Sequence, residues 1–175
     1  MLEAFYPLGQ MTPTKSIRPR LRWASLLAAG LLFASGVAAT QESPEMDSIL
    51  FEWNEQLLNA IRTSQTAPPM ASFKLATLHL AVFEAVNGLD RRHRPYLVEE
   101  EGPEGALPEA ALNAAAYEVL LQLYGDKVNP RLFLELFRAQ QADQREGPAR
   151  DQGEAWGKRV ARQLIERCLA SGKSE

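Results

Sequence analysis

The chain has 175 residues, of which 46% are hydrophobic, and its formal net charge is −3 at pH 7. This acidic balance argues against nucleic acid as a partner, because binding it needs a basic surface that displaces counterions. The only cysteine, Cys168, excludes an intramolecular disulfide, and one cysteine with two histidines is too few for a structural zinc site of Cys and His ligands.

The N-terminal segment has the pattern of a secretory signal peptide. Residues 1–22 hold four basic side chains and one acid, and an uncharged apolar stretch, Trp23–Ala39, ends in the small residues Val37-Ala38-Ala39. The stretch is shorter than the roughly 20 apolar residues that cross a bilayer. We therefore predict a cleavable signal peptide at residues 1–39 and no stable membrane anchor after cleavage. The start could be Met1 or Met11, and export would be to the periplasm or the extracellular space.

Cleavage would leave residues 40–175, which suit one domain. Residues 1–39 carry a net charge of +3 against −3 for the whole chain, so residues 40–175 carry about −6. A first helix is predicted from Ser43-Pro44-Glu45 until just before Thr66, with apolar residues at helical spacing. A second helix is predicted from Pro69 to Val86, ended by Asn87-Gly88. It is apolar nearly all the way round, which predicts a place in the middle of a bundle.

After the second helix the pattern gives a long loop and three more helices. Leu89–Gly105 is predicted to be a loop with an exposed acidic tip. A third helix opens at Pro108 and ends at Gly125, and its alanines would permit close approach by a neighbour. A fourth follows Asn129-Pro130. The fifth, after Gly147-Pro148, carries a stripe of Gly153, Gly157, Val160, Leu164 and Cys168, which makes an inert buried thiol the expectation for Cys168. No run alternates like a strand. The predicted fold class is all-α, with about five helices in a bundle or an orthogonal array.

Few residues are candidates for a functional site. His79 lies in the apolar second helix with Val82 and Phe83 as its helical neighbours, and Glu84 is about 140° further round. The favoured interpretation is a core histidine bonded to a neighbouring helix; the alternative is a contact in a pocket formed with another domain. His79 therefore has no metal ligand or acid–base partner beside it on the helix.

The second candidate is the cluster Arg91, Arg92, His93 and Arg94. Guanidinium groups make bidentate contacts with oxyanions, so the cluster could hold phosphate. The favoured interpretation is a solvated loop whose arginines pair with Glu99, Glu100 and Glu101. No glycine-rich phosphate loop follows a strand, and no Gly-x-Ser-x-Gly sequence occurs.

Phe51–Leu97 resembles a known family. The matching residues are Trp53-Asn54, Ala60-Ile61-Arg62, Pro68-Pro69, the run from His79 to Asn87, Asp90-Arg91-Arg92 and Pro95-Tyr96-Leu97. In these the chain is similar to the N-terminal helical part of bacterial vanadium-dependent haloperoxidase-like proteins, which share a fold with the type 2 phosphatidic acid phosphatases. The similarity continues more loosely through Pro108–Tyr117 and Gly147–Leu169.

The resemblance implies a non-catalytic role for this chain. Members of the family hold vanadate or phosphate with a Lys and an Arg-Pro pair, a Pro-Ser-Gly-His segment, and a later Arg and His, a donor set suited to a charged oxyanion. None of these occurs here: Arg18-Pro19 and Arg94-Pro95 lack the preceding Lys. In the family the catalytic half follows a helix like Asp151–Ala170. No catalytic, cofactor-binding or metal-binding residue is therefore carried over, and vanadate or phosphate would bind only with a catalytic half supplied elsewhere.

Three hypotheses follow. The preferred one is the helical scaffold portion of a secreted haloperoxidase- or phosphatase-like protein from a truncated or split gene, with a separately encoded catalytic half as its partner. The second is a stand-alone exported helical domain that binds a partner or forms a homo-oligomer. The third is a small independent enzyme that uses Glu84, His79 or the arginine cluster.

Overall fold

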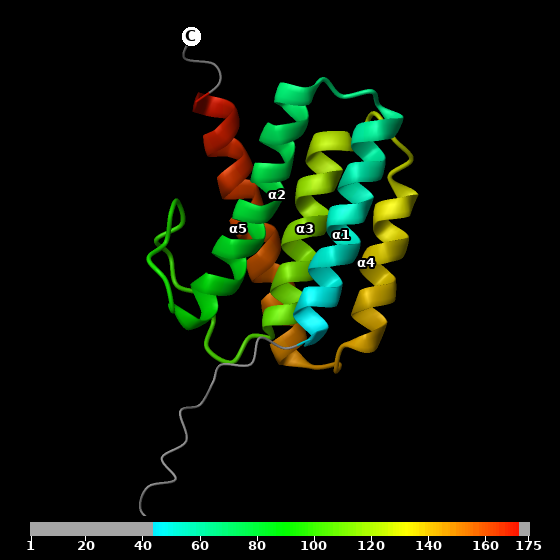
Figure 1. The fold of residues 1–175 in the computed structure, drawn as a ribbon. Coiled ribbons are helices and arrows are strands. Elements are labelled where there is room, and N and C mark those ends of the chain that lie inside the picture. Colours follow the sequence, from blue (N-terminus) through cyan, green and yellow to red (C-terminus); the bar gives the residue numbers. More distant parts are fainter. Residues whose placement is uncertain (1–43, 172–175) are drawn as a thin grey trace, which may run out of the picture. The chain divides into compact units, whose positions relative to one another are not determined.

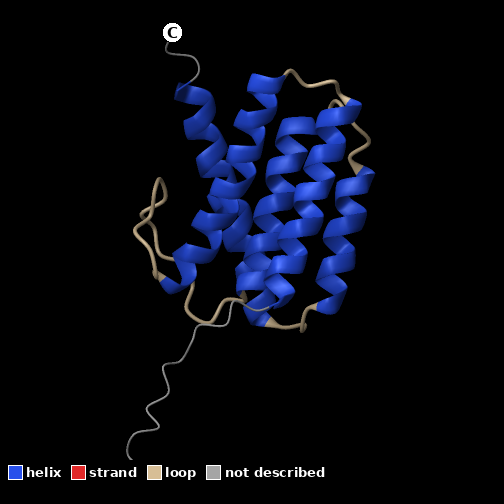
Figure 2. Ribbon diagram, in the orientation of Figure 1, coloured by secondary structure: helices blue, strands red, loops and turns tan. Residues whose placement is uncertain are grey.

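The computed structural model describes residues 44–171, and the predicted signal peptide at 1–39 lies outside them. Within this range the chain forms five α-helices and no strand, which confirms the predicted fold class (Figures 1 and 2). The helices are α1 (Pro44–Thr63), α2 (Pro68–Asp90), α3 (Pro108–Tyr124), α4 (Arg131–Asp143) and α5 (Pro148–Ser171). They lie side by side with their axes roughly aligned, as in a bundle (Figure 1).

The central helix is α3, which packs against each of the other four helices. Eleven of its 17 residues are buried, including all five of its alanines. The prediction that the second helix occupies the middle is wrong. On α2, Met70 is 50% exposed and Phe73 39% exposed, and the buried set includes the polar residues Lys74, Thr77, Glu84 and Asn87. Small side chains let α3 be approached from every side, whereas the large apolar residues of α2 extend onto its outer face.

The contact between α3 and α5 is made at the level of the backbone. A Cβ on Gly157 would lie 2.1 Å from the Ala111 carbonyl oxygen, and one on Gly153 would lie 2.4 Å from that of Leu107. The predicted stripe on α5 is confirmed, with Val160 and Leu164 fully buried. Cys168 is only half-buried, and burial raises the pKa of its thiol, which disfavours the reactive thiolate.

On its other side α3 is joined to two helices by one amide. The indole Nε1–H of Trp53 on α1 donates to Asn113 Oδ1 at 2.9 Å, and Asn113 Nδ2 donates to the carbonyl oxygen of Phe137 on α4 at 3.0 Å. Trp53 is fully buried and Asn113 is 1% exposed. Because buried polar groups need hydrogen-bond partners, this amide fixes the positions of α1 and α4 along the axis of α3.

Helix α2 continues four residues beyond its predicted end at Val86. Gly88 does not terminate the helix; its missing side chain admits the Trp156 ring, because a Cβ there would lie 2.5 Å from that ring. The left-handed residue that ends the helix is Arg91, with φ 51°. In the part of the chain that the structure describes, no helix combines the length and apolarity needed to span a membrane.

Candidate functional site

Glu84, one of the sequence candidates, holds the loop at residues 91–107. Its side chain points from α2 into the interior and is 1% exposed. The backbone N–H groups of Tyr96 and Leu97 donate to Oε1 at 2.7 Å each, and that of Val98 donates to Oε2 at 3.3 Å. A carboxylate with three backbone donors is fully engaged in satisfying main-chain groups. Glu84 therefore orders the loop and is not presented to a ligand.

The same loop is tied down by further hydrogen bonds to α2 and α5. The Asn87 amide donates to the carbonyl oxygen of His93 at 2.9 Å and accepts from its backbone N–H at 2.8 Å. The N–H of Gly102 donates to the Gly88 carbonyl oxygen at 2.9 Å. From α5, the Arg167 guanidinium donates to the Leu97 carbonyl oxygen. The loop is thus folded back on α2 and α5.

The arginine cluster does not act as one group. Arg92 forms an ion pair with Asp90 at 2.6 Å, Arg91 donates to the backbone carbonyl oxygen of Glu99, and Arg94 is exposed. Of the predicted pairing with Glu99–Glu101, only the bond from Arg91 to the Glu99 backbone is present, and the Glu100 carboxylate pairs with Arg159 on α5 at 3.2 Å. The structure therefore gives the three guanidinium groups different surroundings.

His79 is exposed, so the prediction of a core histidine is wrong. Its Nε2 lies 3.3 Å from Oδ1 of Asn54 on α1, so the predicted bond to a neighbouring helix is present but lies at the surface. The apolar residues around His79 in the sequence include Leu80 and Phe83, which are themselves only partly buried. The five-residue spacing of His79 and Glu84 predicts that they lie on different sides of the helix. The structure agrees, since His79 is at the surface and Glu84 is buried.

Lys74 is a buried cation that sequence reasoning missed. It is 6% exposed, lies 3.7 Å from the centroid of the Tyr124 ring, and donates to the Leu123 carbonyl oxygen at 3.4 Å. Burial, and after it the charge of Lys127, lowers the pKa of Lys74. A cation at the C-terminal end of α3 complements the helix dipole. Lys74 therefore has a structural role at the end of the central helix.

A groove of about 620 Å³ opens where the first turns of α1, the C-terminal half of α2 and the start of α3 meet. Of the candidate residues predicted from the sequence, Arg92 and His93 line it, whereas Glu84, His79, Arg91 and Arg94 do not. Most of its lining is apolar. These apolar residues are Met46, Leu50, Val82, Phe83, Val86, Pro108 and Leu112.

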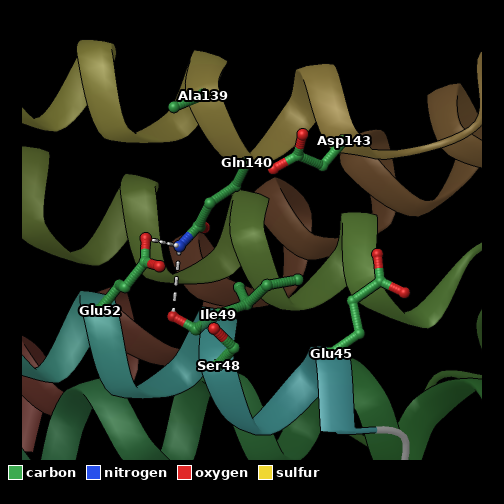
Figure 3. A pocket seen from close by; sticks show the side chains of 7 residues that line it. All are labelled: Glu45, Ser48, Ile49, Glu52, Ala139, Gln140 and Asp143. Carbon is green, nitrogen blue, oxygen red and sulfur yellow. Dashed lines mark hydrogen bonds between the residues drawn. The ribbon is translucent and has the colours of Figure 1, made fainter.

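A smaller cleft of about 270 Å³ lies between α1 and α4 (Figure 3). The residues from α1 are Glu45, Ser48, Ile49 and Glu52, and those from α4 are Ala139, Gln140 and Asp143. The α1 residues have the i, i+3, i+4, i+7 spacing of one helix face. The sequence therefore shows that these α1 residues share a face, but it does not show that α4 lies beside that face.

Neither opening contains a recognisable metal centre. Among residues 44–171, no group of three or more His, Cys, Asp or Glu side chains is arranged to hold a metal ion. No protein-family model, no curated protein and no solved structure matches this chain. The function must therefore be argued from the geometry and from the resemblance given above.

Proposed function

We propose that residues 44–171 form a non-catalytic helical scaffold for a catalytic polypeptide of the vanadium haloperoxidase-like or acid phosphatase kind. The observation that supports this best is the use of Glu84. The buried Glu84 carboxylate accepts hydrogen bonds from three backbone N–H groups and so orders the loop. A residue committed in this way supports a surface and does not carry out acid–base chemistry.

The groove between α1, α2 and α3 is the surface that we assign to the catalytic polypeptide. It is formed largely by the C-terminal half of α2, including Val82 and Val86, and by Arg92 and His93 in the loop that follows. These belong to the stretch on which the resemblance to the family rests, His79–Asn87 with Asp90-Arg91-Arg92. Seven apolar residues line the groove beside Asp47, Asn87, Asp90, Arg92, His93 and Glu109, and such a mixture of apolar and polar side chains suits a protein-binding surface.

The test combines activity with docking. We expect the purified full-length protein to oxidise no bromide with vanadate and hydrogen peroxide, and to hydrolyse no phosphomonoester. A polypeptide encoded next to this chain and carrying the Arg-Pro and Pro-Ser-Gly-His segments should bind it and be active in the complex. Val86→Asp should abolish that binding, because it places a charge in the apolar groove, and Leu132→Asp, an exposed position on α4, should not.

Turnover by this chain alone would refute the proposal, and so would equal binding by the two variants. Self-association, the alternative use of the same groove, would appear in sedimentation as a dimer that Val86→Asp dissociates. That result would favour the stand-alone domain over the scaffold.

Export belongs to the same proposal. The basic segment followed by Trp23–Ala39 is the pattern that supports it. N-terminal sequencing of the protein recovered from outside the cytoplasm should begin at Thr40, and recovery of an uncleaved cytoplasmic chain would contradict it.

A further inference from the structure

The outward face of α2 carries no exposed Asp, Glu, Lys or Arg. Between Pro68 and Leu89 the residues of these types are Lys74 and Glu84, and both are buried. Helix α5, which has a similar length, exposes charged side chains along its outer side, namely Asp151, Arg159, Arg162, Glu166 and Arg167. Charged residues are depleted at the core of protein–protein interfaces. The outward face of α2 therefore has the composition of a surface that another molecule covers.

Apolar residues on this face follow the spacing of a helix–helix contact. We call them the α2 seam, and they are Pro69, Phe73, Ala76, Leu80 and Phe83. The first three are exposed and the last two are partly exposed, with Phe73 at 39%. Neighbouring seam residues are alternately four and three positions apart, the spacing of the a and d positions at which one helix packs along another. The occupant that fits the seam is therefore a helix.

Charge favours a second copy of this chain as the source of that helix. Residues 40–175 carry a net charge of about −6, so two copies repel each other over most of their surfaces. The repulsion is weakest where two faces without charge meet, and a two-fold axis brings the same face of both copies together. A different protein would gain specificity from complementary charges, and the α2 seam offers none.

The sizes of the seam residues select the direction of the second helix. With a two-fold axis at the level of Leu78, residues equally far before and after it lie opposite each other. Ala76 then lies opposite Leu80 of the other copy, and Phe73 lies opposite Phe83. A parallel pair would place alanine on alanine and leave space between the helices. The antiparallel pair fills that space with leucine, as close packing requires.

We propose that the α2 seam joins two copies of this chain in an antiparallel dimer with two-fold symmetry. The dimer does not rest on the scaffold function. Phe83 belongs both to the seam and to the groove assigned to the catalytic polypeptide, whereas Phe73, Ala76 and Leu80 do not line the groove. Substitutions at these three positions therefore act on the dimer and leave the groove intact.

Sedimentation velocity of the purified full-length protein over a range of concentrations tests the dimer. Phe73→Asp and Ala76→Asp should each raise the dissociation constant at least about 100-fold, because each places two charges in the apolar contact, one from each copy. Both positions are exposed in the single chain, so thermal unfolding should be unchanged. The matched controls are Leu132→Asp and Ala142→Asp, at an exposed leucine and an exposed alanine of α4, and they should leave the dissociation constant unchanged.

Cysteine cross-linking tests the direction of the helices. The background is Cys168→Ser, which removes the only cysteine. Under mild oxidation, Ala76→Cys mixed with Leu80→Cys should give a covalent dimer that contains one chain of each variant. Ala76→Cys alone should react much more slowly, because the two copies of residue 76 lie about 6 Å apart along the helix axis. Equally fast cross-linking of Ala76→Cys with itself would show a parallel pair and overturn the antiparallel arrangement.

The remaining outcomes separate the dimer from the use of the groove. A protein that stays monomeric at every concentration would overturn the proposal, and so would a dimer that Phe73→Asp and Ala76→Asp leave intact. A dimer dissociated by Val86→Asp alone would place self-association in the groove and not at the seam. Binding of the catalytic polypeptide should survive Ala76→Asp, so failure of the dimer and failure of the scaffold function can be distinguished.

Discussion

The two sides of α3 are built in different ways. Toward α5, glycines bring one backbone against another, with Gly153 and Gly157 facing the carbonyl oxygens of Leu107 and Ala111. Toward α1 and α4, the connection is a side-chain amide, that of Asn113. Close backbone packing leaves little space between two helices, whereas helices held apart by side chains leave openings between them. Both the groove and the α1–α4 cleft involve α1, whereas a hollow of about 420 Å³ on α5 lies along one face of that helix alone.

The largest effect should follow from adding one methyl group to the side that packs on α5. In Gly157→Ala, the new Cβ would lie 2.1 Å from the Ala111 carbonyl oxygen, a backbone atom that moves only if α3 moves. Alanine favours the helix by about 1 kcal/mol over glycine, but overpacking at this distance outweighs that gain. We expect a net loss of about 3 kcal/mol in the free energy of unfolding, measured by urea denaturation.

Gln152→Ala, at an exposed position on the same helix, is the control and should change stability by less than about 0.5 kcal/mol. If Gly157→Ala were as stable as the original chain, α3 and α5 would not be in backbone contact, and the contrast between the two sides would disappear.

A smaller effect is expected on the other side. Asn113→Ala leaves the fully buried Trp53 indole N–H without an acceptor and removes a donor from the Phe137 carbonyl oxygen. The expected loss is about 2 kcal/mol, the usual cost of an unsatisfied buried polar group. Asn59→Ala, an exposed position on α1, should be nearly neutral. Urea denaturation measures the change, and unaltered stability of Asn113→Ala would contradict it.

The helical fold could be predicted because 3.6-residue periodicity and Pro or Gly at helix ends are local signals. Which helix is central could not be predicted. The sequence shows that α2 is more apolar all round than a surface helix, but not that the alanines of α3 permit neighbours on every side. Asn87-Gly88 has the composition of a helix stop, yet Gly88 serves to admit Trp156, a residue 68 positions away in the sequence.

The role of Glu84 depends on contacts with main-chain groups, and the pattern of side chains in a sequence does not predict such contacts. Glu84 is bound by N–H groups that 12 to 14 residues of chain separate from it, and any residue type could have supplied them. The prediction of a core histidine rested on the apolar neighbours of His79 in the sequence, but Leu80 and Phe83 are only partly buried, although Val82 is buried. The polar cleft needed the position of α4 beside α1, which depends on both helices packing on α3.

The smallest effect should come from Gln140, the residue whose amide connects α1 and α4 across the cleft. Gln140→Met removes two hydrogen bonds, at 3.1 Å to Glu52 and 3.4 Å to Ile49, and at the same time removes the unpaired Oε1. Loss of the bonds destabilises the protein, while loss of the buried unpaired oxygen offsets much of that cost. Methionine has a similar volume and keeps the packing. We expect the free energy of unfolding to change by less than about 1 kcal/mol in urea denaturation, less than for Asn113→Ala. A loss as large as that of Asn113→Ala would make Gln140 a structural bridge equivalent to Asn113, and the side of α3 facing α1 and α4 would then be held by two amides.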